Sequence, residues 1–236
     1  MRSLRYFAVD TDTCGRPKFV VVDPSQGDNP PMQDLLTITL NVPQVLKDGV
    51  LASLPLISEI TDLELRGQVV EAWALSLALN GYTRIEELPG SGMPEAPVKG
   101  DQTHHLLGVA YIALGIKESL EKVFGVEMSV DRDTLIAAAL CHDIGKTYEY
   151  NPSNRERWEA DSRISGKPAI RHPAYGAYIA LVAGLPERIA HVCACHSPEG
   201  RFVERSLAAT IVHHADDSYW FVTETAENWH GMIPRL

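Results

Sequence analysis

The second half of the chain divides into helix-length apolar segments that carry their own start and stop signals. Gly145 can close one of these segments, and Pro173 suits the first turn of another. Ser58 or Thr61 can cap the first helix of the series. Helical spacing of the apolar positions predicts helices over residues 58–79, 103–124, 131–141, 173–183, 186–196 and 202–223. The body of the protein is therefore expected to be mainly α-helical.

Signals for β-structure are confined to the beginning of the chain. Residues 6–9 and 19–22 alternate in patches around a turn at 14–17, which predicts a small hairpin. A Pro- and Gly-rich loop and short helical turns follow it. We therefore expect two parts: residues 1–57 with the β-hairpin and connecting segment, and residues 58–236 as a helical domain with the functional site.

Charge and composition narrow the classes of partner. A formal net charge of −10 over 236 residues argues against a broad surface for long nucleic acid, which clustered Lys and Arg would hold. No apolar run reaches the roughly 18 residues of a membrane helix, and the four cysteines suggest buried thiols rather than disulfides. A cytoplasmic protein with a small ligand and no membrane partner is expected. The hairpin edge could pair with another subunit in a homo-oligomer or cover the core of its own chain.

A loop rich in Pro and Gly separates the first long helix from the second. Residues 88–102 contain three prolines and three glycines, a composition that favours irregular structure. The loop could act as a flap over a site or serve as a plain connector. The sequence leaves both interpretations open.

His142 and Asp143 follow an apolar helix, where burying two adjacent polar residues is costly unless they have strong partners. A metal is such a partner. The other candidate ligands lie near helix ends, which converge readily in a bundle: His105, His172, His196 and Asp216. Imidazole and carboxylate together suit divalent iron, manganese, cobalt, nickel or zinc, and a bridging carboxylate suits a pair of them.

The run His142-Asp143-Ile144-Gly145-Lys146 resembles the signature of the HD-domain superfamily of metal-dependent phosphohydrolases. Further matches in the same order are His105 with Val109-Ala110, His172-Pro173 with Gly176, His196 with Glu199-Gly200, and Ala215-Asp216. The resemblance covers about half of the chain. It implies an HD-domain helical bundle and, through His172 and His196, the subset with two metals and six ligands.

The resemblance also implies how the ligands are shared. His105, His142 and Asp216 would hold one metal, His172 and His196 the other, and Asp143 would bridge them. The two metal ions are expected to be iron or manganese, with cobalt, nickel and zinc as alternatives. His105 is preferred over His104 for its distance to Val109-Ala110, and Asp216 over Asp217 for the alanine before it.

Residues in and around this motif are candidates for catalysis and for binding the substrate. Asp143 and Lys146 are the candidate catalytic residues, since an ammonium one turn beyond the ligands can neutralise a phosphate oxygen. Lys146 could instead be a cation that interacts favourably with the dipole at a helix end. Lys167 and Arg171 are the candidate substrate contacts within a polar insert that could equally be a solvated loop of ion pairs. His213 lies one turn before Asp216 and could reach substrate or serve as a hydrogen-bonded structural histidine.

Three functions are consistent with the sequence. The expected function is a phosphohydrolase or phosphodiesterase that cleaves a nucleotide or another small phosphorylated metabolite through a metal-bound hydroxide. The alternative is an HD-type mixed-valence diiron oxygenase that cleaves a C–C or C–P bond. A binding module without catalysis is the third, and the full ligand set with Lys146 argues against it.

Overall fold

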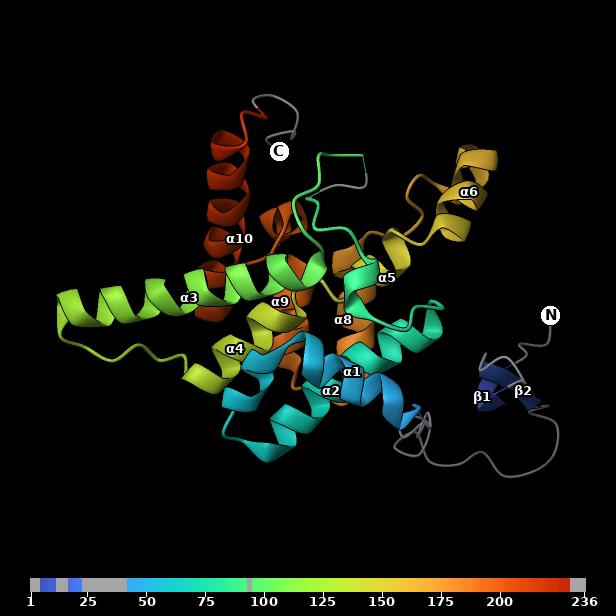
Figure 1. The fold of residues 1–236 in the computed structure, drawn as a ribbon, viewed down its shortest axis with the longest axis horizontal. Helices are drawn as coiled ribbons and strands as arrows, with labels where there is room; N and C mark the ends of the chain where they lie inside the picture. Colours follow the sequence, from blue (N-terminus) through green and yellow to red (C-terminus); the bar gives the residue numbers. More distant parts are fainter. Residues whose placement is uncertain (1–4, 12–16, 23–41, 93–94, 230–236) are drawn as a thin grey trace.

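A computed structural model of the chain describes residues 5–11, 17–22, 42–92 and 95–229 (Figure 1). It is mainly helical, which confirms the predicted fold class at that level. The elements are β1 (Arg5–Thr11), β2 (Pro17–Val22), α1 (Gln44–Ser53), η1 (Pro55–Glu59), α2 (Leu63–Leu79), η2 (Ile85–Glu87), α3 (Gln102–Phe124), α4 (Arg132–Cys141), α5 (Lys146–Glu149), α6 (Pro152–Ala160), α7 (Ser162–Ser165), α8 (His172–Val182), α9 (Glu187–Cys195), η3 (Pro198–Phe202) and α10 (Leu207–Ala226), where η marks a short 3-10 helix.

Helix α4 is the centre of the core. Every residue from Thr134 to Cys141 is buried, and the helix contacts α2, α3, α9 and α10. The indole N–H of Trp73, on α2, donates to the carbonyl of Leu140 at 2.8 Å, which ties α2 to the end of α4. The chain therefore leaves α4 at a point that is surrounded by other helices.

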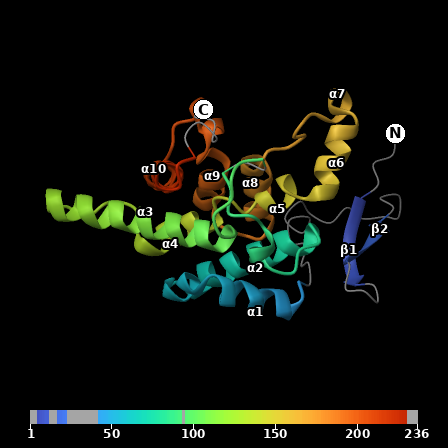
Figure 2. The ribbon, with the colours of Figure 1, turned by 45° about the horizontal axis from the view of Figure 1, so that its top comes forward.

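Two pairs of helices surround that point. Helix α8 packs along α9, and α10 packs across α3 (Figure 2). Gly108 of α3 permits the second contact, because a Cβ there would lie 2.4 Å from the ring of Tyr219 on α10. The residues at the ends of these helices consequently converge beside the end of α4.

Two predicted helices begin later than the sequence indicated. Helix α2 begins at Leu63 instead of residue 58, because a 3-10 turn forms first and Asp62 caps the helix by accepting from the N–H groups of Glu64 and Leu65. Neither Ser58 nor Thr61 is the cap. Helix α10 begins at Leu207 instead of residue 202, and Ser206 caps it.

The polar insert before His172 is helical rather than a loop. It forms α6 and α7, and Asn151 caps α6 by accepting from the N–H groups of Ser153 and Asn154. Trp158 is the only buried residue of these two helices, at 2% exposure. One buried residue gives too little apolar periodicity for the sequence to indicate a helix.

Strands β1 and β2 pair antiparallel, with Arg5 opposite Val22 and Phe7 opposite Val20. This pairing does not establish the predicted hairpin as part of the fold, because the side chains of both strands lie outside the described residues. Helix α1 and η1 pack into the same core as the later helices, and the predicted division at residue 57 stays a prediction. Among the described residues, we find no helix with the length and apolar character of a membrane span.

Candidate metal centre

The carboxylate of Asp143 lies at the middle of the six predicted ligands, just beyond the end of α4, and it is 1% exposed. Its Oδ2 atom is 3.0 Å from Nε2 of His105 and 3.3 Å from Nε2 of His142. Its Oδ1 atom is 3.4 Å from Nε2 of His172 and 3.5 Å from Nε2 of His196. Each oxygen therefore faces a different pair of histidines.

Asp216, from the middle of α10, completes the group. Its Oδ1 atom lies 3.4 Å from Nε2 of His105, and His105, His142 and Asp216 form one cluster with metal-ligand spacing. His142, Asp143 and His196 form a second such cluster. The structure thus brings all six predicted residues together around Asp143.

Three buried side-chain atoms of this group make no hydrogen bond within the described residues. They are Oδ1 of Asp216, Nε2 of His196 and Nδ1 of His105. A buried polar atom without a partner is costly, and a divalent cation would satisfy the first two. The donor set of imidazole nitrogens and carboxylate oxygens fits such a cation.

Hydrogen bonds on the far side of three rings fix which nitrogen faces Asp143. Nδ1 of His142 donates to the carbonyl of Ala139 at 2.7 Å, and Nδ1 of His196 donates to the carbonyl of Cys193 at 3.0 Å. Nδ1 of His172 lies 2.6 Å from Oε2 of Glu149. Because a carbonyl or carboxylate accepts the N–H, each Nε2 presents a lone pair to the centre, as metal ligation requires.

Burial and charge shift the pKa values of three of these four groups in the directions that a metal site needs, and His142 is the exception. Burial lowers the pKa of His105 to about 4 and also lowers that of His196, which favours the neutral ring that a metal ligand requires. Burial alone would lower the pKa of His142, but the adjacent Asp143 carboxylate outweighs it and raises the value. Burial alone would raise the pKa of Asp143, yet Lys146 and His142 hold it well below its usual range.

Lys146 is buried at 2% exposure and contacts the centre directly. Its Nζ atom lies 2.6 Å from Oδ2 of Asp143 and donates to the carbonyl of Ser91 at 3.0 Å. The hydroxyl of Tyr150 donates to the same carbonyl at 3.1 Å. The 88–102 loop therefore reaches the centre through its backbone, while its action as a flap stays a prediction.

Two neighbours of the centre carry no signal in the sequence. The side-chain amide of Gln102 donates to Oδ2 of Asp143 at 3.0 Å, and Glu149 accepts from both the backbone N–H and the ring of His172. Glu149 is 3% exposed. Its partner is 23 residues away along the chain, so local spacing could not reveal the contact.

The structure separates the adjacent candidates that the sequence left open. His105 is fully buried at the centre, whereas His104 faces outward and closes a capping box with Asp101 at the start of α3. Asp216 faces His105, whereas Asp217 lies 3.7 Å from Nε2 of His213 and is 45% exposed. The geometry favours His105 and Asp216 as the residues of the centre.

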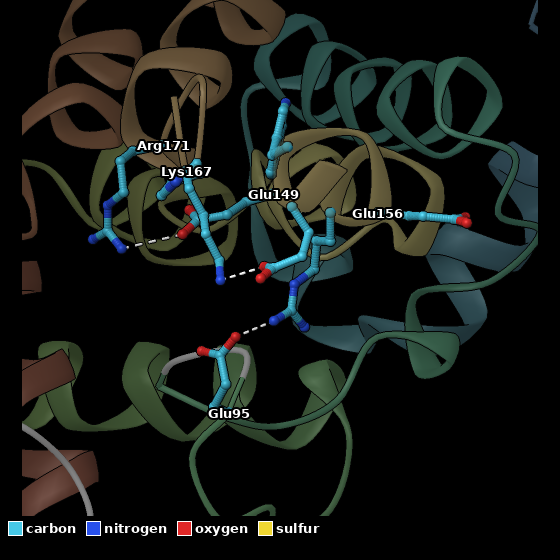
Figure 3. A pocket seen from close by; sticks show the side chains of 9 residues that line it. Glu95, Glu149, Glu156, Lys167 and Arg171 are labelled. Carbon is cyan, nitrogen blue, oxygen red and sulfur yellow. Dashed lines mark hydrogen bonds and ion pairs between the residues drawn. The ribbon is translucent and has the colours of Figure 1, made fainter. Parts of the chain in front are cut away.

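The predicted substrate contacts lie in different places. Arg171 and Lys167 line a pocket of about 470 Å³ next to α6, with Glu95 on its opposite side (Figure 3). Arg171 contacts Glu149 at 3.1 Å and Glu199 at 3.0 Å, and Lys167 forms an ion pair with Glu159. His213 is not in this pocket, and its Nδ1 donates to the carbonyl of His196 at 2.6 Å.

Comparison with known proteins agrees with the helical fold and the buried donor group. The model of the HD domain family matches residues 103–218, a stretch that includes all six residues of the centre. Residues 103–218 of this chain therefore belong to the HD-domain superfamily.

A curated relative extends this comparison. The dihydroneopterin 2',3'-cyclic phosphate phosphodiesterase of Methanocaldococcus jannaschii is 29% identical to this chain over 170 residues. The match covers 69% of this chain and 66% of the relative, just under two thirds of its length. No solved structure matches significantly.

Proposed function

We propose that this chain is a metal-dependent hydrolase of phosphoric esters and acts as a phosphodiesterase on a small phosphorylated substrate. The observation that carries the proposal is the buried Asp143 carboxylate, whose two oxygens each face a separate pair of histidines. The HD domain over residues 103–218 and the relative named as a phosphodiesterase support it.

In this proposal, His105, His142 and Asp216 would hold one divalent ion, His172 and His196 would hold a second, and Asp143 would be shared between them. Iron or manganese is proposed, because mixed imidazole and carboxylate donors suit these ions. When bound, such a pair supplies hydroxide from water near neutral pH and polarises a phosphoryl oxygen.

Lys146 supplies positive charge to the reacting phosphate. Burial alone would lower its pKa, but the Asp143 carboxylate outweighs burial and raises it, so the ammonium stays charged. In a buried site this charge is poorly screened, and it can stabilise the negative charge that develops on the phosphoryl oxygens. Asp143 contributes by holding both histidine pairs at one carboxylate.

Glu149 orients His172 from outside the centre. A carboxylate that accepts the second ring N–H of a ligating histidine fixes the orientation of the ring and raises its basicity. The distance of 2.6 Å between Nδ1 of His172 and Oε2 of Glu149 suits this role. Glu149 also contacts Arg171, so the same carboxylate connects the centre to the adjacent pocket.

We assign the remainder of the substrate to the pocket lined by Lys167 and Arg171. Its volume of about 470 Å³ is in the range of small-ligand sites. The relative is named for the cleavage of dihydroneopterin 2',3'-cyclic phosphate, and we propose a small cyclic phosphate as the substrate class here. The predicted contact of His213 with substrate stays a prediction outside this proposal.

The test measures metal content and hydrolysis together. The protein is purified without chelator, its metals are quantified, and it is assayed with and without air against cyclic nucleotides, phosphomonoesters and dinucleotides. We expect about two metals per chain and oxygen-independent cleavage of a phosphodiester. Asp143→Asn and His105→Ala should lose metal and at least about 100-fold in activity, since centre residues act together.

His104→Ala is the matched control for His105→Ala, because His104 is the adjacent histidine and faces solvent. It should keep both the metal content and the activity of the unchanged protein. Two irons without phosphoester cleavage, together with a response of the iron spectrum to dioxygen, would replace this proposal by the diiron oxygenase.

A further inference from the structure

A second group of metal-type donors lies on α10, away from the Asp143 centre. It consists of His213, His214 and Asp217, and one donor atom from each lies within 4.8 Å of the others. The group is accessible to solvent: the side chains of His213 and Asp217 are 22% and 45% exposed, and His214 is also exposed. None of the three contributes to the clusters around Asp143.

The hydrogen bond of His213 determines its tautomer. Its Nδ1 atom lies 2.6 Å from the carbonyl oxygen of His196. Since a carbonyl oxygen can only accept, Nδ1 must carry the hydrogen. In the neutral ring, Nε2 then presents a lone pair, as it does in metal-ligating histidines whose other nitrogen donates to a backbone carbonyl.

That lone pair faces another acceptor. Nε2 of His213 lies 3.7 Å from Oδ2 of Asp217, one helical turn further along α10. Two acceptors at this separation favour a shared cation or a proton between them. The ring of His214 lies beside that of His213, with 5.0 Å between the centroids, and it supplies a third donor that a simple ion pair would not need.

We propose that His213, His214 and Asp217 form an accessory, exchangeable site for a divalent cation of the Zn²⁺ class, distinct from the Asp143 centre. Two imidazole nitrogens and one carboxylate suit Zn²⁺, Co²⁺ or Ni²⁺, and water can complete the coordination at this exposed position. A cation on Nε2 of His213 also holds its Nδ1–H against the carbonyl of His196, which belongs to the centre.

The experiment counts metals in the full chain. Protein that already carries its own centre metals is titrated with Zn²⁺ by calorimetry, and zinc and the centre metals are both quantified after gel filtration. We expect one additional zinc per chain with a Kd in roughly the micromolar range, about −8 kcal/mol. His214→Ala and Asp217→Asn should each weaken this binding at least about tenfold.

His104→Ala is the control, because His104 and Asp101 form a histidine–carboxylate pair at the surface for which the described residues provide no third metal-type donor. It should bind zinc like the unchanged protein. The inference is overturned if no additional zinc binds up to millimolar concentration. It is also overturned if zinc only replaces a centre metal, or if His214→Ala and Asp217→Asn bind it unchanged. The readout is stoichiometry, so it does not depend on the hydrolase activity.

Discussion

Glu149 lies outside the six donors and contacts one of them, His172, directly. Replacing it by Gln keeps the size of the side chain but removes the charge that His172 faces at 2.6 Å. Outer contacts of this kind typically account for a 10–100-fold effect on metal affinity or activity. We expect Glu149→Gln to lower metal affinity by about that factor, measured by competition with a chelator of known affinity.

Glu156→Gln is the matched control for Glu149→Gln. Glu156 lines the same pocket. Among the described residues, no contact connects its side chain with a histidine of the centre. Its replacement should change the metal affinity less than about twofold. Equal losses in both variants would mean that Glu149 acts through the general charge of the pocket and does not orient His172.

Glu199 gives a prediction about acid stability. Burial alone would raise its pKa, but hydrogen bonds from Ser197 and Arg171 outweigh burial and lower it to about 2 from an ordinary 4.5. Stability from a lowered carboxylate pKa is fully present above the unfolded value and is lost as the pH falls toward the folded value. In metal-free protein, Glu199→Gln should therefore flatten the fall in melting temperature between pH 4.5 and 2.

The effect should stay below about 1 kcal/mol, because this ion pair is partly exposed and screened by solvent. Calorimetric melting at steps of half a pH unit measures it. Parallel melting profiles of Glu199→Gln and the unchanged protein across this range would contradict the assignment.

At the residue scale, the sequence indicated the donors better than their neighbours. The motif from His142 to Lys146 and the histidines at helix ends predicted a group that the structure does bring together. Gln102 and Glu149 were missed because their contacts with the centre join distant parts of the chain. Charge alone also could not show that Arg171 contacts two carboxylates.

Gly145 determines how closely the turn after α4 approaches α8. A Cβ at this position would lie 2.0 Å from the carbonyl oxygen of His172 and 2.7 Å from the backbone nitrogen of Gly176. Both neighbours are backbone and cannot simply rotate away. Gly145→Ala should therefore destabilise the protein by about 1–3 kcal/mol or more and displace His172 from Asp143.

Gly115→Ala is the control at the scale of elements. Gly115 lies inside α3, and a Cβ there meets nothing within 4 Å. Because Ala is the better helix former, this change should stabilise the protein by roughly 0.5–1 kcal/mol. Chemical denaturation and metal content distinguish the two variants, and a Gly145→Ala protein with unchanged stability and metal would refute the close contact.

Helices with strong apolar periodicity were predictable, while their first residues were less so. The α4 prediction was accurate to one residue because Asp131 is a clear cap, whereas α2 began later because Asp62 competes with two earlier candidate caps. The α6 and α7 helices were missed because they bury only Trp158. Packing of the insert against distant residues is not encoded in its local pattern.

At the scale of the whole molecule, metal binding and folding should be coupled. The six donors lie on or beside α3, α4, α8, α9 and α10, so the unfolded chain cannot present them together. A ligand that binds only the folded state stabilises it by about 2.7 kcal/mol at 100 times its Kd. We expect chelation to lower the melting temperature by roughly 5–10 °C for each metal ion removed from a chain of this size.

Returning the metal should restore the melting temperature, and His105→Ala should show a smaller shift than His104→Ala. Scanning calorimetry with elemental analysis of each sample provides the measurement. An unchanged melting temperature after verified metal removal would mean that the donors are held in place by packing alone.

The distribution of the donors along the chain also has a consequence during protein synthesis. His105 leaves the ribosome first and Asp216 last, 111 positions further along the sequence. At roughly 5–20 residues per second, synthesis of that interval takes several seconds or more. Nascent chains that end before α10 would expose His105 without Asp216, so we expect the complete centre to acquire its metals only after α10 has emerged and folded.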